Sequence, residues 1–419
     1  MKTEEHKTPS TPIPTLQPTP STPTCRKPTN PALIWRLIIL IASLIIYGIY
    51  KNACAMPTTD TDLSPYTDTI HIPFIYNFST KHVPQVMCTV EGVDIEMPID
   101  TGSTGTLIGA PILPNIPPTA GTPAHHFFTS SKILYVGRLV DLSIDFIGKG
   151  ASYATAVVPV LIVDKSWRCA WYDPSKHTFT CPPGPDGEEA GERDTSNITY
   201  MGVGFGRNGP RDGKPYATPK VNPFLNVEAI DGERLSNTAM RVGYIISTKG
   251  IHLGLTSSNT RSFTFTDLEP GLTHDMDPRD WAMANMCFSI NGRGRNCGTA
   301  LVDTGIAQMY IRAEGDVSIP TVIIPNPNPN GYAAMVKRVK PGTNVTIGFP
   351  SLKGTAMSYS FVVGDNTSIE PSFVCPQRAD HPPFVNTGRN LLFGYSMAFD
   401  AVGGRFGFRP VDSSSSSVL

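Results

Sequence analysis

PIDTGST at residues 98–104 and LVDTGIA at residues 301–307 contain the same Asp-Thr-Gly triplet, each after an apolar run. Because each of the three residue types makes up about 5 to 7% of an average protein, one such triplet is expected only about 0.1 times in a chain of 419 residues. Two copies with similar flanks are improbable by chance. The repetition therefore predicts a chain with two related halves.

Each triplet predicts a carboxylate on a tight loop at the end of an apolar strand. Its glycine lets neighbouring backbone approach closely, and its threonine can hydrogen-bond across to the other loop. If a pseudo-twofold axis brings the loops together, the two carboxylates lie too close for both to ionise freely, so the pair shares a proton. The expected catalytic residues are Asp100 and Asp303, and the expected supporting residues are Thr101, Gly102, Ser103, Thr304 and Gly305.

Alternating sequences elsewhere predict a mostly β fold. The chain has 37 glycines and 40 prolines, scattered through segments that contain Thr, Val and Ile, as expected for many short strands joined by turns. Long amphipathic helical patterns are scarce. Strand periodicity is clear in LVDLSIDFIG (139–148), MRVGYIIS (240–247), SYSFVVG (358–364) and GRFGFRP (404–410).

The two triplets and their surroundings resemble the pepsin-like aspartic protease family. VMCTVEGVDIEMPIDTGS (86–103) is similar to the strand-turn-strand lead into the first signature of that family. YMGVGFGR (200–207) is similar to the apolar-apolar-glycine element that closes the first active-site loop. NLLFGYSMAFDAVGGRFGFRP (390–410) resembles its counterpart in the second lobe, with Leu391 to Gly394 expected beneath Asp303.

This resemblance implies a bilobal, pepsin-like double-β-barrel fold over about residues 71–410, with one lobe at 71–240 and the other at 241–410. It also implies hydrolysis of polypeptide substrates at acidic pH by a monomer, without a metal, a cofactor or an acyl-enzyme. One carboxylate acts as general base on a bound water, and its protonated partner donates to the scissile carbonyl. Which aspartate is the base stays open, because the proton belongs to the coupled pair.

A tyrosine in KILYVGRLVDLSIDF (132–146) is the candidate for a substrate-binding flap residue. Tyr135 is followed by a glycine two positions later and then by an alternating strand, which resembles the flap hairpin of the family. The alternative is a tyrosine on an ordinary strand face.

The two triplets differ in the residue that follows the glycine. Ser103 can hydrogen-bond Asp100, whereas Ile306 offers Asp303 no hydroxyl, so one supporting hydrogen bond is expected to be missing. This difference keeps open an alternative function, a pepsin-fold binding or inhibitory protein with weak or lost turnover.

An apolar segment near the N-terminus predicts a membrane anchor. ALIWRLIILIASLIIYGIY (32–50) is about long enough to span a bilayer, and the basic residues at or before its start favour a cytosolic N-terminus. The folded body is then lumenal or extracellular on a single-pass type II membrane protein. The alternative is a secreted protein cleaved near Ala55. The flanking segments are a Thr/Pro-rich disordered tail at 1–31, a polar stem at 51–70 and a flexible tail at 411–419.

The cysteines and sequons fit an oxidising secretory compartment. Cys25 precedes the apolar segment and Cys54 lies at its edge, which leaves six cysteines well beyond it. The short interval from Cys169 to Cys181 makes these two the best candidate for a local disulfide. The pairing of the other four stays open. Four glycosylation sequons also follow the apolar segment, at Asn77, Asn197, Asn344 and Asn366.

The bulk composition excludes some other functions. A formal net charge of -1, with only 16% charged residues, gives no electrostatic footprint for nucleic acid. No HExxH or CxxC motif predicts a metal site.

Overall fold

The computed structural model describes residues 61–207, 217–236, 238–328 and 333–411. These residues are mostly β, as the alternating sequences predict, with strands at all four of the segments quoted above. The helices among the described residues are short 3-10 turns: η1 (Ala110–Ile112), η2 (Lys149–Ala151), η3 (Pro219–Val221), η4 (Pro223–Leu225) and η5 (Arg389–Phe393).

Within the described part of the chain, no helix is both long and apolar enough to cross a membrane. The anchor predicted at 32–50, the tail at 1–31, the first ten residues of the stem and the tail from residue 412 all lie outside the described residues.

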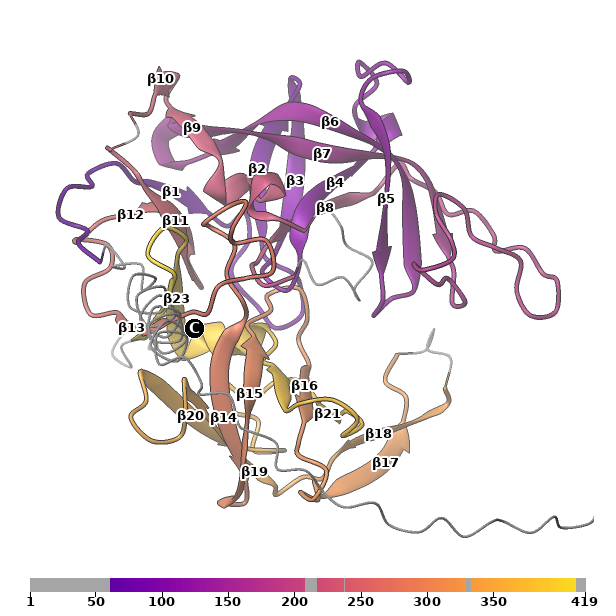
Figure 1. Ribbon diagram of the computed structural model, residues 1–419, viewed down its shortest axis with the longest axis vertical. Coiled ribbons are helices and arrows are strands. Elements are labelled where there is room, and N and C mark those ends of the chain that lie inside the picture. The colour runs from indigo at the N-terminus through magenta and orange to yellow at the C-terminus, as the bar shows by residue number, and fades with distance from the viewer. Residues whose placement is uncertain (1–60, 208–216, 237, 329–332, 412–419) are drawn as a thin grey trace, which may run out of the picture. The chain divides into compact units, whose positions relative to one another are not determined.

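A nine-stranded sheet contains most of the first half of the chain (Figure 1). Pairing between β6 and β7 closes a ring of six neighbours, in the order β7, β4, β8, β3, β2 and β6. The sheet consists of β10 (Glu233–Arg234), β9 (Val227–Ile230), β7 (Tyr153–Arg168), β4 (Thr104–Gly109), β8 (Thr199–Val203), β3 (Val93–Asp100), β2 (Gln85–Val90), β6 (Ile133–Ile147) and β5 (Thr122–Phe128).

A seven-stranded sheet contains much of the second half of the chain. The seven strands are β20 (Met357–Val362), β19 (Asn344–Phe349), β14 (Ala284–Ile290), β15 (Arg293–Leu301), β22 (Phe384–Asn386), β16 (Met309–Arg312) and β21 (Val374–Pro376). Strands β17 (Thr321–Pro325) and β18 (Met335–Val339), which come between β16 and β19 in the sequence, form a separate two-stranded hairpin.

The same three-strand unit recurs in these two sheets. In the first half, β8 lies between β3 and β4, parallel to β3 and antiparallel to β4. In the second half, β22 lies between β15 and β16, parallel to β15 and antiparallel to β16. In each unit, an Asp-Thr-Gly loop connects the two outer strands. The middle strand comes from a distant segment of the chain and pairs with both outer strands.

A six-stranded sheet joins the beginning of the described chain to its end. Its strands are β1 (Ile70–Pro73), β12 (Gly250–Leu255), β11 (Arg241–Ser247), β23 (Tyr395–Asp400), β24 (Arg405–Pro410) and β13 (Thr264–Asp267). Strand β1 pairs with β12 across about 180 residues of sequence. One apolar core cluster includes Ile72, Phe146, Phe288 and Phe399, which come from all three large sheets. The three sheets therefore share one continuous core.

The last part of the predicted stem belongs to this folded body instead. Leu63 is buried against Ile245 and Leu255 of the six-stranded sheet, and the backbone of Thr67 and Asp68 bonds to the Ala239 carbonyl. Residues 61–70 of the predicted polar stem at 51–70 are thus part of the folded body. These residues are polar on average, but Leu63 and Ile70 provide enough apolar surface to be buried.

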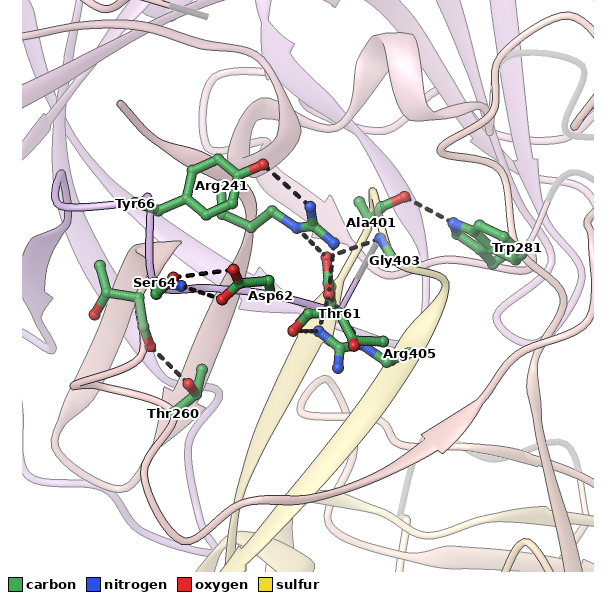
Figure 2. A network of polar contacts seen from close by, with 12 residues as sticks. Thr61, Asp62, Ser64, Tyr66, Arg241, Thr260, Trp281, Ala401, Gly403 and Arg405 are labelled. Carbon is green, nitrogen blue, oxygen red and sulfur yellow. Dashed lines mark hydrogen bonds and ion pairs between the residues drawn. The ribbon is translucent and has the colours of Figure 1, made fainter. Parts of the chain in front are cut away.

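A buried ion network holds this N-terminal segment on the hairpin formed by β23 and β24 (Figure 2). Asp400, which is fully buried, accepts hydrogen bonds from Arg241 at 2.8 Å and from Arg405 at 2.6 Å. Arg241 also donates to the Tyr66 hydroxyl, and Arg405 donates to the Thr61 carbonyl. The carboxylate thus neutralises part of the charge of two arginines that would be costly to bury alone.

Two disulfides are present among the described residues. Cys169 pairs with Cys181, as predicted from their spacing, and Cys287 pairs with Cys297 across neighbouring strands β14 and β15. Cys88 and Cys375 are unpaired and buried. They lie in different sheets, on β2 and β21.

We predict that Asp400→Asn lowers the free energy of unfolding by about 3–5 kcal/mol, because it leaves two buried arginines without their counter-charge. Urea unfolding at pH 7 measures this loss. The control is Lys176→Gln, which removes an exposed ion pair with Asp173 and should change stability little. Equal effects of the two substitutions would contradict the prediction.

Candidate active site

The two aspartates occupy equivalent places in the two three-strand units. Asp100 ends β3, and Asp303 follows β15; each is only 7% exposed. A methyl group on Gly305 would lie 2.7 Å from Asp100 Oδ1 and 3.0 Å from Asp303 Oδ1. Both carboxylates therefore approach the same point, and only glycine leaves room for them there.

Four hydrogen bonds join the two aspartate loops. The Thr101 hydroxyl donates to the Val302 carbonyl at 2.7 Å and accepts from the Thr304 N–H at 3.1 Å. The Thr304 hydroxyl donates to the Ile99 carbonyl at 2.6 Å and accepts from the Thr101 N–H at 3.0 Å. All four bonds are buried, so they fix the separation of the loops and hence of the carboxylates.

Asp100 accepts three hydrogen bonds. The Gly102 N–H donates to Oδ1 at 2.6 Å, and the Ser103 hydroxyl donates to Oδ2 at 2.8 Å, as the sequence predicts. The third donor is the Tyr200 hydroxyl, which contacts Oδ2 and also lies 2.6 Å from the Ser103 hydroxyl. Donors to the ionised form of a carboxylate favour that form.

Asp303 accepts two hydrogen bonds from neutral donors. The Gly305 N–H donates to Oδ1 at 2.8 Å, and the Asn386 side-chain amide donates to Oδ2 at 2.6 Å. The Asn386 amide comes from another strand, β22, 83 positions away in the sequence. As expected, Ile306 supplies no donor, and Asp303 accepts one hydrogen bond fewer than Asp100 among the described residues.

The pKa of Asp303 is raised to about 8. Burial is the main cause, because it disfavours the charged form, and the negative charge of Asp100 adds to the effect. The hydrogen bonds from Asn386 and Gly305 oppose the rise without cancelling it. These causes favour the protonated form of Asp303.

A buried arginine lies behind the second loop. Arg389 is 4% exposed, and its guanidinium donates to the Gly305 carbonyl at 2.8 Å and to the Thr80 carbonyl at 3.4 Å. Burial lowers the pKa of Arg389, whereas the charges of Asp303 and Asp100 act in the opposite direction. A cation at this place favours a single negative charge on the aspartate pair.

The candidate flap tyrosine lies on the hairpin of β5 and β6. Tyr135 is half-buried, and its ring meets the Phe128 ring edge-on, with centroids 5.7 Å apart. Phe128 in turn meets the Tyr200 ring edge-on at 4.8 Å. Phe128, at the end of β5, is thus a hairpin residue whose ring contacts Tyr200, which in turn contacts Asp100.

Neither a protein-family model nor a curated protein matches the chain. Among the described residues, no group of three or more His, Cys, Asp or Glu side chains could hold a metal ion. The function of the chain is therefore inferred from the chemistry of its two aspartate loops.

The segment beside the second aspartate differs from the one expected. Leu391 and Leu392 are buried in η5, not in a strand beneath Asp303. Strand β22 takes that place, with Asn386 opposite Leu301 and the Thr387 N–H bonded to the Leu301 carbonyl. Both segments combine apolar residues with a glycine, and only the strand pairing distinguishes them.

Three residues of the site were not identified from the sequence: Tyr200, Asn386 and Arg389. The available signal was the shared pattern of a polar residue two positions before a glycine, in Tyr200-Met201-Gly202 and in Asn386-Thr387-Gly388. That pattern is too common to predict a site without the strand register.

We predict that Thr304→Val destabilises the protein, because it leaves the buried Thr101 N–H and Ile99 carbonyl without a partner. Each unsatisfied group costs about 1–3 kcal/mol, measurable by urea unfolding. The control is Thr106→Val: the Thr106 hydroxyl is buried and has no hydrogen-bond partner among the described residues, so its loss should be nearly neutral. A comparable loss from both substitutions would argue against the cross-loop bonds.

We also predict that Asp303→Asn flattens the dependence of stability on pH. The folded protein holds the Asp303 proton up to its raised pKa of about 8, whereas the unfolded chain releases it near the ordinary carboxyl pKa of 3.8. Wild-type stability should therefore fall as pH rises from about 4 to 8. Asn cannot ionise, so the free energy of unfolding of the variant, relative to that of the wild type, should rise between about pH 4 and pH 8. If the free energy of unfolding changes by the same amount between pH 4 and pH 8 in the wild type and in Asp303→Asn, the prediction is contradicted.

Proposed function

We propose that this chain is an aspartic endopeptidase that hydrolyses peptide bonds through a water activated by Asp100 and Asp303. The observation that carries the proposal is the pair of buried aspartates on two equivalent loops joined by reciprocal threonine hydrogen bonds. This arrangement also favours a bilobal, pepsin-like double-barrel fold with lobes at about 71–240 and 241–410. Both aspartates come from one chain, which fits a monomer.

Asp100 is the general base in this proposal. Its three hydrogen-bond donors and the nearby Arg389 cation favour its ionised form, whereas burial keeps a proton on Asp303. The Asp100 carboxylate takes a proton from the bound water as the water oxygen adds to the scissile carbonyl carbon. Asp303 gives its proton to the carbonyl oxygen, forming a neutral gem-diol.

The second half of the reaction breaks the carbon–nitrogen bond. The proton held by Asp100 passes to the peptide nitrogen, and the carbonyl forms again as the amine leaves. Asp303 recovers a proton from the gem-diol hydroxyl, which returns the pair to one proton and one negative charge. The net change is addition of one water across one peptide bond.

The pH range of activity follows from the two protonation states. Activity needs Asp100 ionised and Asp303 protonated, so it is lost at low pH when Asp100 gains a proton and at high pH when Asp303 releases one. A pKa of about 8 for Asp303 extends activity from acidic pH towards neutral. The proposed working range is therefore acidic. The fall in activity at high pH, the base limb of the pH profile, should come at a higher pH than the ordinary pKa of a carboxyl group.

The β5–β6 hairpin is the proposed flap. Its Phe128 contacts Tyr200 beside Asp100, and Tyr135 supports Phe128 from the neighbouring strand. Aromatic side chains at this place exclude water from the carboxylates and pack against an extended substrate.

We further propose that residues 32–50 anchor the enzyme in a membrane as a single-pass type II protein, with release by cleavage near Ala55 as the alternative. The two disulfides favour an oxidising compartment for the body. The asparagines of all four predicted glycosylation sequons are exposed, as an acceptor side chain requires.

Digestion of a peptide library by the full-length protein at several pH values tests the activity. We expect cleavage at acidic pH that is blocked by a transition-state-mimicking inhibitor of aspartic proteases. Asp303→Asn and Asp100→Asn should each lower kcat/KM by at least about 10²-fold, because each removes a group that transfers a proton. The exposed residue Asp316 provides the control, and Asp316→Asn should retain full activity.

Two outcomes would contradict the proposal. If wild type and Asp303→Asn are equally inert at every pH, the chain is a binding or inhibitory protein that has kept the loops. If cleavage persists in both aspartate variants, another group performs the reaction.

A further inference from the structure

Two polar side chains occupy equivalent positions beside the two aspartates. Gly202 lies opposite Asp100 in the parallel pair of β3 and β8, and Tyr200 precedes this glycine by two residues. In the second unit, Asn386 lies opposite Leu301 and precedes Gly388 by two residues. The repeat therefore inserts one hydrogen-bond donor beside each carboxylate, but the two donors differ in chemistry.

Tyr200 is a permanent donor to Asp100. Its hydroxyl contacts Asp100 Oδ2 and the Ser103 hydroxyl, and its ring is held by the edge of Phe128. Burial and the adjacent Asp100 charge raise the pKa of Tyr200 well above its usual range. The phenol therefore keeps its proton at every pH at which the site works.

Asn386 is a donor of fixed orientation to Asp303. Its side-chain oxygen accepts the Gly388 N–H at 3.1 Å, so its amide nitrogen must face Asp303 Oδ2, where it lies 2.6 Å away. Asn386 is 7% exposed, which leaves water little access to compete for these bonds. This amide is the counterpart of the Tyr200 hydroxyl, and the second loop has no counterpart of the Ser103 hydroxyl, because Ile306 occupies that position.

The side-chain donors and the backbone donors bind different oxygens of the two carboxylates. Tyr200, Ser103 and Asn386 bind the Oδ2 atoms, whereas the Gly102 and Gly305 N–H groups bind the Oδ1 atoms. Both Oδ1 atoms also lie near the point marked by Gly305.

We propose that Tyr200 and Asn386 are positioning residues that make the two aspartates unequal: Tyr200, with Ser103, holds Asp100 as the carboxylate, and Asn386 orients the protonated Asp303. This inference rests on the proposed peptidase function. Both residues act through the aspartates and need not touch the substrate.

The first test is the pH profile of kcat/KM for Tyr200→Phe, with a peptide substrate from the library digest. Loss of one donor to the carboxylate favours protonated Asp100, so the acid limb should move up by about one pH unit. The control is Tyr359→Phe: Tyr359 is also a buried tyrosine, and its hydroxyl has no hydrogen-bond partner among the described residues. An acid limb that stays in place while activity falls evenly would overturn the role of Tyr200.

The second test removes the Asn386 donor to Asp303 and then offers Asp303 a new donor from the residue that follows Gly305. Asn386→Leu should lower kcat by about 10-fold or more and move the base limb to higher pH, because the neutral form of Asp303 is then favoured. Adding Ile306→Thr places a hydroxyl after Gly305, as Ser103 follows Gly102, and should restore part of the rate and move the base limb back. An unmoved base limb with no rescue would overturn the role of Asn386.

A titration separates this inference from the proposed function. Carbon-13 NMR of full-length protein with labelled aspartate carboxyl groups measures the proton affinity of the pair without any turnover, and Asp100→Asn and Asp303→Asn assign its signals. If the wild type is inert but Tyr200→Phe raises the midpoint of Asp100, the function fails and the positioning role stands. If the midpoint is unchanged, the role fails whether or not the protein cleaves peptides.

Discussion

The reciprocal hydrogen bonds between Thr101 and Thr304 are the constraint on which the site depends. Two carboxylates repel each other when both are ionised, so nothing in their own chemistry keeps them together. The four cross-loop bonds supply that constraint, because each threonine satisfies a donor and an acceptor of the opposite loop. The strands behind the loops, and the segments inserted between those strands, hold the threonines in place.

A single negative charge is the state that the surroundings of the pair favour. Arg389 is buried behind the second loop, and its charge offsets one carboxylate but not two. Five hydrogen-bond donors surround the pair, three on Asp100 and two on Asp303. The uneven distribution of donors, rather than the aspartates themselves, distinguishes the base from the acid in the proposed mechanism.

The six-stranded sheet explains how two similar halves act as one body. Strand β1 belongs to the first half of the sequence but pairs within the second, and the buried Asp400 holds Arg241 and Arg405 from different strands. Separation of the halves would expose this network together with the continuous apolar core. The aspartate loops can therefore keep a fixed distance although they come from sheets that share no strand.

Local information in the sequence is enough for the mostly β fold, the repeated aspartate loops and the Cys169–Cys181 disulfide, since alternation, a repeated triplet and a short cysteine interval each act over few residues. It also marks Asp100 and Asp303 as a pair. Tyr200 and Asn386 depend on folding, because they lie 100 and 83 residues from the aspartates that they contact. Their placement is set by which segment enters between two strands and in which register, and long-range packing of the core controls both.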